Sequence, residues 1–500
     1  MELFRQYRPP VPLNLDPIDS TEKLSVSVAN DSGVFSFRVT RDSTKIRLWD
    51  TSIGGLQFAD QYIQIATYLP TDKIYGFGEN VHQEIKHDFT HYTTWGMYAR
   101  DQGPQSDNGL GQNLYGVHPF YLALEEDGKA HGVFIFNSNA QDVTTGPAPH
   151  LVYRTIGGQI ELYYFPGPTP EDVVKQYHQL IGKPFLPAYW ALGFQISRWG
   201  YNGVSDVKDV IDRTKAAGIP QDVQFADIDY MDKYKDFTYD HDKWADWPNF
   251  TDYLHSQGQR VILIFDPAIE ADYDVFQRGI DANVSWISWP RADLVPQDVQ
   301  SQYPMAKDTK IMLGIVWPDK HVGFPDFLDP TGVTTQWWAD EFKRYHDLQA
   351  FDGIWIDMNE PSNFATNQDH DKKRGVKGAP GDTTLKCPLT GPDSTFDMPP
   401  YKTEGVYIWG DSTTMSSNTL CLIASTMRGQ TNFYNTKSLY GYSEAVATWA
   451  GLEKARGKRG AIISRSSFPG MGTVSGHWLG DNRATWNDLR SCETEGKVLS

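Results

Sequence analysis

Downstream of residue 183, short apolar runs of strand length alternate with segments of helical periodicity, and this alternation constrains the fold more than any other feature. Strands separated by helices pair in parallel, because each connection crosses the sheet before the next strand begins. The sequence therefore predicts an α/β domain of the (β/α)8-barrel type. The predicted strands are 189–199, 223–230, 260–268, 351–360, 460–464 and 473–479, and the predicted helices are 204–217, 250–255, one through Trp337, Phe342 and Tyr345, and 443–454.

Six strands are expected in this domain, which we place at residues 183–500, whereas a closed barrel has eight. The sequence thus predicts an incomplete barrel, as in a shortened form of a longer protein. An insertion at about 269–327, rich in polar and turn-forming residues, interrupts the alternation. The loop 361–409 is rich in Gly, Pro, Asp and Thr, and we expect it to border the functional site.

The N-terminal third carries a different pattern. Between residues 23 and 165, short runs of alternating apolar and polar residues are separated by turn formers, without helical periodicity. This pattern is typical of an antiparallel β-sandwich. Thr169, Pro170 and the acids that follow then predict the start of a helix, which Gly182 ends. We assign residues 1–182 to an N-terminal β-sandwich domain with its linker helix.

The predicted strand at 351–360 contains an acid at the end of its apolar run. Strand alternation places Asp357 on the face opposite to Ile354 and Ile356. In a parallel barrel, acids at the carboxyl ends of strands lie in the mouth of the active site. Asp357 is therefore the first candidate for chemistry, and the alternative is that it caps the next helix.

Charged or polar residues recur at the ends of the other predicted strands. Ordinary solvent-exposed surface charges would not be expected to recur at this one position in successive strands. Two such acids can divide glycoside cleavage, one as an ionised nucleophile and the other as an acid that becomes the base. Asp227 and Asp229 could alternatively bind a divalent cation, but no third ligand set or phosphate loop accompanies them, so we expect neither a metal nor a cofactor. The residues at these strand ends are Arg198, Trp199, Asp227, Asp229, Asp266, Asp357, Arg465 and Asp481.

Composition narrows the classes of partner. The net charge of −18 argues against nucleic acid and anionic membranes, because both require a cationic surface. No apolar run reaches the length of a membrane span and no signal-peptide pattern is present, so we expect no membrane insertion. Cys387 and Cys421 flank a loop-like region in which they can pair. Sequons at Asn30, Asn249 and Asn283 slightly favour the secretory pathway.

Seven short segments occur in order between about residues 70 and 490: Gly76-Phe77-Gly78-Glu79, Asn113-Leu114-Tyr115-Gly116, Tyr189-Trp190-Ala191-Leu192-Gly193-Phe194, Asp227-Ile228-Asp229-Tyr230-Met231, Gly353-Ile354-Trp355-Ile356-Asp357-Met358-Asn359-Glu360, Arg465-Ser466 and His477-Trp478-Leu479-Gly480-Asp481-Asn482. Together they resemble glycoside hydrolase family thirty-one. The resemblance covers most of the chain, so chance agreement is remote.

The resemblance implies roles for individual charged residues. Asp357 would be the nucleophile and Asp481 the acid/base. Asp227, Arg465 and Asp101 would hold the hydroxyls of the sugar in the innermost subsite. For Asp101, which lies in a loop of the β-domain, turn formation is the alternative role.

The resemblance also implies a pocket wall. Glu360 would support the loop rather than react, since strand alternation turns it away from Asp357. Ordinary core packing is an equal alternative for Ile264 and Trp317. The implied wall residues are Trp199, Ile264, Trp317, Trp355, Met358 and Trp478.

By the same resemblance, the chain would be a retaining, maltase-like α-glucosidase that releases glucose from non-reducing ends of α-linked oligosaccharides. Two alternatives remain: an inactive shortened form that binds carbohydrate or a partner, and another family activity such as α-xyloside hydrolysis. The family's late-barrel histidine has no counterpart here. The predicted partner is the oligosaccharide substrate, and the oligomeric state is left open. The parent protein is expected in the secretory pathway, outside the cell or in lysosomes.

Overall fold

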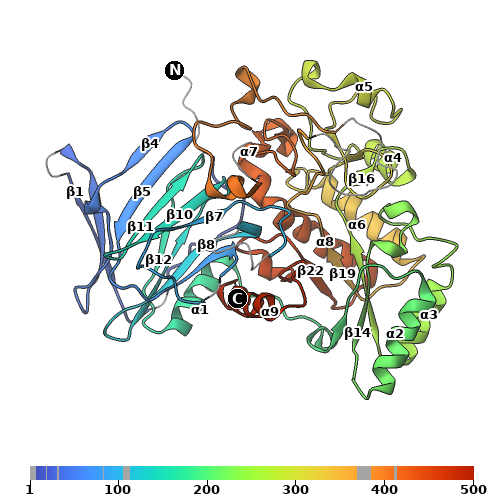
Figure 1. Ribbon diagram of the computed structural model, residues 1–500, viewed down its shortest axis with the longest axis horizontal. Coiled ribbons are helices and arrows are strands. Elements are labelled where there is room, and N and C mark those ends of the chain that lie inside the picture. The colour runs from blue at the N-terminus through green and yellow to red at the C-terminus, as the bar shows by residue number, and fades with distance from the viewer. Residues whose placement is uncertain are drawn as a thin grey trace.

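The computed structural model shows a β-rich N-terminal part beside an α/β part (Figure 1). The N-terminal strands, coloured blue to teal, occupy one side of the molecule, and the α/β part, coloured green to red, occupies the other. The structure describes residues 7–18, 20–30, 33–82, 84–104, 113–368, 384–409 and 414–499, with the side chains of 407–409 and 493–499 left out.

Two antiparallel sheets form the N-terminal part. One has eight strands in the order β1-β2-β3-β5-β11-β10-β7, with β4 paired to β5, and the other has four in the order β12-β9-β8-β6. The antiparallel strands expected here are thus present, whereas their face-to-face packing as a sandwich stays a prediction. The strands are β1 (Leu24–Ala29), β2 (Ser36–Arg41), β3 (Arg47–Asp50), β4 (Gln57–Ala59), β5 (Tyr62–Tyr68), β6 (Ile74–Asn80), β7 (Thr93–Met97), β8 (Asn113–Leu124), β9 (Ala130–Ile135), β10 (Gln141–Gly146), β11 (His150–Thr155) and β12 (Leu162–Phe165).

Helix α1 (Pro170–Ile181) follows these sheets, as predicted. The hydroxyl of Thr169 accepts a hydrogen bond from the backbone N–H of Asp172 at 3.2 Å, which caps the first turn. Gly182 ends the helix with a φ of 100°, a backbone conformation that favours glycine. Local sequence therefore determined both ends of this helix.

The α/β part contains a parallel sheet of six strands in chain order, β13-β14-β15-β19-β22-β23. This order is that of consecutive βα units, and it confirms the six predicted strands. The strands are β13 (Gln195–Ile196), β14 (Val223–Ala226), β15 (Arg260–Phe265), β19 (Gly353–Ile356), β22 (Ala461–Ser464) and β23 (Gly476–His477). The helices between them are α2 (Val204–Ala216), α3 (Trp247–Ser256), α6 (Val333–His346) and α8 (Tyr440–Arg456).

The two outermost strands are shorter than predicted. A 3-10 turn at Tyr189–Leu192 replaces the first half of the expected strand 189–199, and another at Met471–Thr473 precedes β23. Each of these strands has one neighbour in the sheet, and each pairs through only two residues among those described. A strand at the edge of a sheet can therefore be shorter than the apolar run that predicts it, because hydrogen bonds to a neighbouring strand stabilise it on one side only.

The segment expected to be an insertion contains short elements between β15 and α6, three of which form the antiparallel sheet β16-β18-β17. Its elements are β16 (Ile269–Glu270), α4 (Asp274–Asp281), α5 (Gln297–Gln300), β17 (Leu313–Gly314) and β18 (Val322–Gly323), with a 3-10 turn at Ala292–Leu294. The loop after β19 carries the short pair β20 (Ser425–Thr426) and β21 (Thr431–Asn432), then α7 (Phe433–Thr436). Cys387 and Cys421, whose pairing the sequence left open, form a disulfide with a Cα–Cα distance of 5.2 Å.

Near the C-terminus lies α9 (Trp486–Leu499). Across the part of the chain that the structure describes, no helix is both long and apolar enough to cross a membrane.

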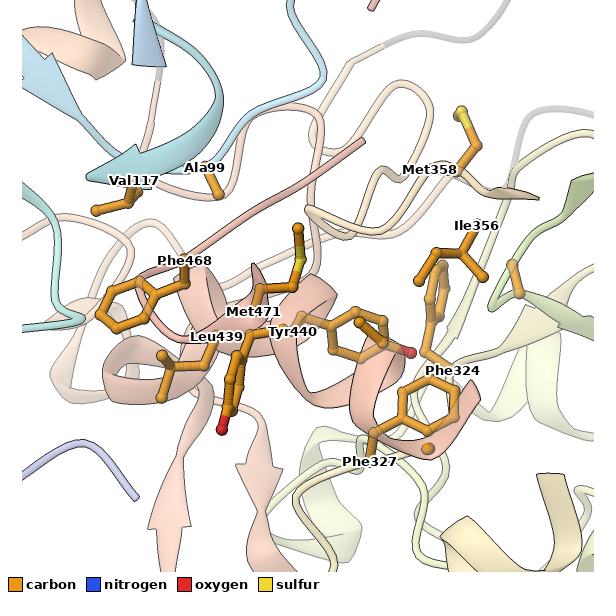
Figure 2. Close-up of a cluster of buried hydrophobic side chains, with 14 of the residues drawn as sticks. Ala99, Val117, Phe324, Phe327, Ile356, Met358, Leu439, Tyr440, Phe468 and Met471 are labelled. Atoms are coloured by element: carbon orange, nitrogen blue, oxygen red, sulfur yellow. The ribbon is translucent and has the colours of Figure 1, made fainter. Parts of the chain in front are cut away.

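One hydrophobic core extends through both parts of the molecule. Ala99 and Val117, from the N-terminal part, belong to the same buried cluster as Leu439 and Phe468 of the α/β part (Figure 2). This shared core fixes the loop after β7 against the carboxyl end of the parallel sheet. A site at that end can therefore include residues from both parts.

Candidate active site

Three charged residues meet at the carboxyl ends of neighbouring parallel strands. Asp357 directly follows β19, Arg465 directly follows β22, and Asp481 lies four residues after β23. The backbone N–H of Arg465 donates to the carbonyl of Ile356 at 3.2 Å, which continues the parallel ladder up to the two charged residues. The strands thus bring residues more than a hundred positions apart to one place.

The guanidinium of Arg465 is the centre of this arrangement. Its Nε lies 2.9 Å from Oδ1 of Asp357, its Nη2 3.4 Å from Oδ1 of Asp101, and its Nη1 3.7 Å from Oδ2 of Asp481. The side chain of Arg465 is 3% exposed, so these ion pairs are poorly screened by solvent. The structure therefore brings together Asp101, Asp357, Arg465 and Asp481, which the sequence singled out separately.

Glu360 also faces Arg465, contrary to the expectation from strand alternation. Its two carboxylate oxygens accept bidentate hydrogen bonds from Nε and Nη2 of Arg465 at 2.8 and 2.9 Å. The alternation ends at Met358, whose positive φ of 55° turns the backbone after Asp357. Glu360 and Asp357 consequently contact the same guanidinium. Glu360 itself is 1% exposed, so its contact with Arg465 is buried in the protein interior.

The two candidate catalytic carboxyls differ in their surroundings. Burial raises the pKa of the Asp357 carboxyl, while the ion pair with Arg465 opposes that shift. Nearby Asp481 and Glu360 raise it further because like charges disfavour ionisation. The net effect raises the pKa of Asp357 to about 8, and Arg465 is the neighbour that favours its ionised form. Asp481, in contrast, has a side chain that is 72% exposed.

Three further residues complete the cluster, and the sequence argument did not assign them to the site. The hydroxyl of Tyr115 donates to Oδ2 of Asp481 at 3.2 Å, and that of Ser362 donates to Oδ2 of Asp101 at 2.7 Å. Buried Lys437 donates to the backbone carbonyl of Glu360 at 3.3 Å. Tyr115 lies inside one of the seven segments, which was the available signal, whereas nothing in the sequence pointed to Lys437.

Aromatic side chains lie beside the charged cluster. Trp355 and Trp478 meet edge to face with ring centroids 5.3 Å apart, and Trp355 also contacts Phe225 at 5.8 Å. The sulfur of Met358 accepts a hydrogen bond from Nη2 of Arg465 at 3.2 Å. Trp355, Met358 and Trp478 are thus adjacent to one another or to Arg465, as a pocket wall would require.

Within the part of the chain that the structure describes, the other three expected wall residues are not joined to the cluster by such contacts. Trp199 is 64% exposed, and Ile264 is buried within β15. Trp317 packs edge to face against Phe364, with centroids 5.1 Å apart. For Ile264 the burial is that of an ordinary core residue, and the role of these three residues in a pocket wall stays a prediction.

Asp227 follows β14 at the same end of the sheet. Its carboxylate accepts a hydrogen bond from the backbone N–H of Ile228 at 2.7 Å, and burial raises its pKa to about 7. Asp229 instead accepts from the N–H of Gly200 at 2.7 Å. Two carboxylates on one strand face would suit a divalent cation, but β14 ends at Ala226, Asp227 caps the 3-10 turn Ile228–Tyr230 and Asp229 lies within that turn. The premise of the cation alternative is therefore wrong.

The raised pKa of Asp227 predicts a pH-dependent contribution to stability. A carboxyl with a pKa of about 7 in the folded state and about 3.9 in the unfolded chain contributes stability in its neutral form, which is lost as pH rises through 7. Between pH 5 and pH 8 we expect the wild type to lose about 2–3 kcal/mol more than Asp227→Asn, which does not titrate. Urea unfolding at both pH values measures the difference, and parallel losses would refute it.

Comparisons with known proteins match both parts of the chain. The family model described as "Glycosyl hydrolases family 31 TIM-barrel domain" matches residues 184–496, and that of the "Glycosyl hydrolase 31 N-terminal galactose mutarotase-like domain" matches residues 13–143. The chain is 40% identical over 505 residues to intestinal sucrase-isomaltase of Homo sapiens, covering 97% of this chain and 26% of the relative. It is 38% identical over 448 residues to lysosomal alpha-glucosidase of Mus musculus, covering 88% of this chain and 41% of the relative.

Solved structures share the fold. The glucosidase II alpha subunit in its alpha3-Glc2-bound form aligns with a TM-score of 0.72 at 20% identity, over 96% of this chain and 51% of that one. A GH31 dextranase of Flavobacterium johnsoniae complexed with glucose aligns with a TM-score of 0.69 at 16% identity, over 98% of this chain and 52% of that one. This chain therefore spans about a quarter to two fifths of these two curated relatives and about half of these two structures.

Proposed function

This chain belongs to glycosyl hydrolase family 31, and from that premise we propose that it is the catalytic region of a retaining α-glucosidase that releases glucose from non-reducing ends of α-linked oligosaccharides. The observation that carries the proposal is the pair of carboxylates, Asp357 and Asp481, on one guanidinium. The names of the curated relatives, sucrase-isomaltase and lysosomal alpha-glucosidase, support glucose as the released sugar.

The proposed reaction is a double displacement. Asp357 attacks the anomeric carbon while Asp481 protonates the leaving oxygen, and a covalent glycosyl–enzyme forms. Asp481 then takes a proton from water, which attacks the anomeric carbon and releases Asp357. The ion pair with Arg465 supports the first role because it favours the ionised nucleophile, and the exposure of Asp481 supports the second because the leaving group and water must reach it.

Substrate binding is assigned to the remaining charged and aromatic residues at this end of the sheet. Asp227, Asp101 and Arg465 would accept and donate hydrogen bonds to the sugar hydroxyls. Their position around the carboxylate pair supports this assignment. Trp355 and Trp478 offer flat apolar faces to the ring, and Met358, Trp199, Ile264 and Trp317 would extend the wall.

A panel of substrates tests the proposal. We expect release of 4-nitrophenol from its α-glucoside and of glucose from maltose, with much slower release from the α-xyloside. NMR of the first-formed sugar should show the α-anomer, because two inversions restore the configuration. Initial β-anomer would refute retention. Binding of maltose without turnover would favour the carbohydrate-binding alternative.

The location of the parent protein is proposed on similar grounds. Relatives at about 40% identity are named as intestinal and lysosomal enzymes. The disulfide between Cys387 and Cys421 is typical of proteins that fold in an oxidising compartment. We therefore place the parent protein in the secretory pathway, with its substrate as the expected partner.

A further inference from the structure

A tyrosine from the N-terminal part reaches into the cluster at the end of the barrel sheet. Tyr115 belongs to β8, and its hydroxyl donates to Oδ2 of Asp481 at 3.2 Å. The same hydroxyl accepts a hydrogen bond from the backbone N–H of Asp481, also at 3.2 Å. Tyr115 therefore holds both the main chain and the carboxyl group of one residue.

The loop that carries Asp481 is shaped around the ring of Tyr115. Gly480 has a φ of 84°, and a Cβ at this position would lie 2.1 Å from Cε2 of the tyrosine. On another side, Gly103 of the Asp101 loop would place a Cβ 3.4 Å from the tyrosine hydroxyl. The guanidinium of Arg465 lies 4.6 Å from the ring centroid. The ring of Tyr115 is thus enclosed by the backbone of the site, and it is fully buried.

The side chain of Asp481 depends on a contact that holds it in place more than the side chain of Asp357 does. Its side chain is 72% exposed, and it lies beyond β23, which joins the sheet through two residue pairs in the described chain. Its contact with Arg465, at 3.7 Å, is longer than that of Asp357 at 2.9 Å. An exposed side chain on a loop samples several rotamers, whereas general acid catalysis needs one orientation.

We propose that Tyr115 is the positioning residue that fixes Asp481 for proton transfer, so that the N-terminal part contributes directly to the chemistry of the barrel. This inference rests on the proposed function, in which Asp481 is the acid/base. Tyr115 occupies Oδ2 and leaves the other carboxyl oxygen to carry the transferable proton. Burial also raises the pKa of the Tyr115 phenol well above its usual value of 10, which keeps the donor protonated.

Substrates with different leaving groups test this role. Maltose requires protonation of its leaving oxygen, whereas α-glucosyl fluoride departs with little acid assistance. In Tyr115→Phe, which keeps the ring, we expect kcat/KM on maltose to fall about tenfold and kcat/KM on α-glucosyl fluoride to change less than about twofold. The ratio kcat/KM is compared because it reports formation of the glycosyl–enzyme, in which the leaving groups differ, and not the later attack of water, which both substrates share.

Tyr121→Phe is the matched control. Tyr121 lies on the same strand and is also fully buried, and its hydroxyl has no hydrogen-bond partner among the described residues. We expect both substrates to be hydrolysed at wild-type rates by this variant. An equal loss of kcat/KM on both substrates in Tyr115→Phe, or no loss of kcat/KM on maltose, overturns the inference.

A crystal structure of Tyr115→Phe separates this inference from the proposed function. If the wild type hydrolyses neither substrate, the proposed function fails, and the crystal structure of the variant then decides whether Tyr115 fixes the Asp481 side chain. We expect the Asp481 side chain to leave its wild-type rotamer or to occupy several in the variant. A single unchanged rotamer would overturn the positioning role whatever the activity.

Discussion

Asp357→Asn is expected to lower kcat/KM for α-glucosides by roughly 10⁴-fold or more, because an amide cannot form the covalent intermediate that the proposed mechanism requires. Asn has nearly the same shape, and Arg465 retains the bidentate contact with Glu360, so the fold should persist. Initial rates of 4-nitrophenol release from the α-glucoside measure the effect, and circular dichroism checks the fold.

Asp347→Asn is the matched control for this substitution. Asp347 follows α6, is exposed, and pairs with Lys343 one helical turn earlier. The same chemical change there should leave the rate unchanged. If Asp357→Asn retained a rate within about tenfold of the wild type, Asp357 would not be the nucleophile.

Arg465→Gln is expected to remove activity and to destabilise the fold by about 3–5 kcal/mol. Arg465 is 3% exposed and pairs with Asp101, Asp357, Glu360 and Asp481, so its loss leaves several carboxylates without their shared counter-charge. Urea unfolding measures the loss of stability. Arg291→Gln is the control, because Arg291 bridges two aspartates at the surface and its loss should leave the unfolding midpoint nearly unchanged.

The effect of Arg465→Gln should depend on pH in a definite direction. Burial raises the pKa of Glu360 in the folded protein, and Arg465 opposes that shift. Without Arg465 the pKa rises further above its unfolded value of about 4.3, so the neutral form is favoured on folding. That contribution is present at low pH and lost as pH rises. We therefore expect a larger destabilisation at pH 8 than at pH 5, and a larger one at pH 5 would contradict the arrangement.

Much of the barrel could be predicted because it depends on local pattern. The alternation of apolar runs and helical segments predicted all six strands of the parallel sheet, and the cap at Thr169 predicted the start of α1. The lengths of the strands were less predictable at the two edges of the sheet, where β13 and β23 each have one neighbouring strand. A periodic sequence indicates which residues prefer burial, but pairing decides how far a ladder extends.

The candidate site was predicted in its residue types but not in its contacts. Acids at the ends of strands pointed to Asp357 and Asp481, because parallel strands present their carboxyl ends at one face. Glu360 was expected to face away, since the positive φ of Met358 could not be anticipated from strand alternation. Ser362 and Lys437 carried no signal of their own, because their roles depend on which distant residues they meet.

The sequence by itself determined the α/β pattern and the antiparallel N-terminal strands, because burial preference and strand ends are properties of neighbouring residues. The roles of Asp357 and Asp481 as a pair were implied by the family resemblance and stay a prediction. Only the tertiary structure decided that one guanidinium, Arg465, holds Asp101, Asp357, Glu360 and Asp481 together, and that a tyrosine 366 positions earlier in the chain touches Asp481. Such contacts form between segments far apart in the chain, so they depend on the packing of the N-terminal part against the barrel, which no local pattern specifies.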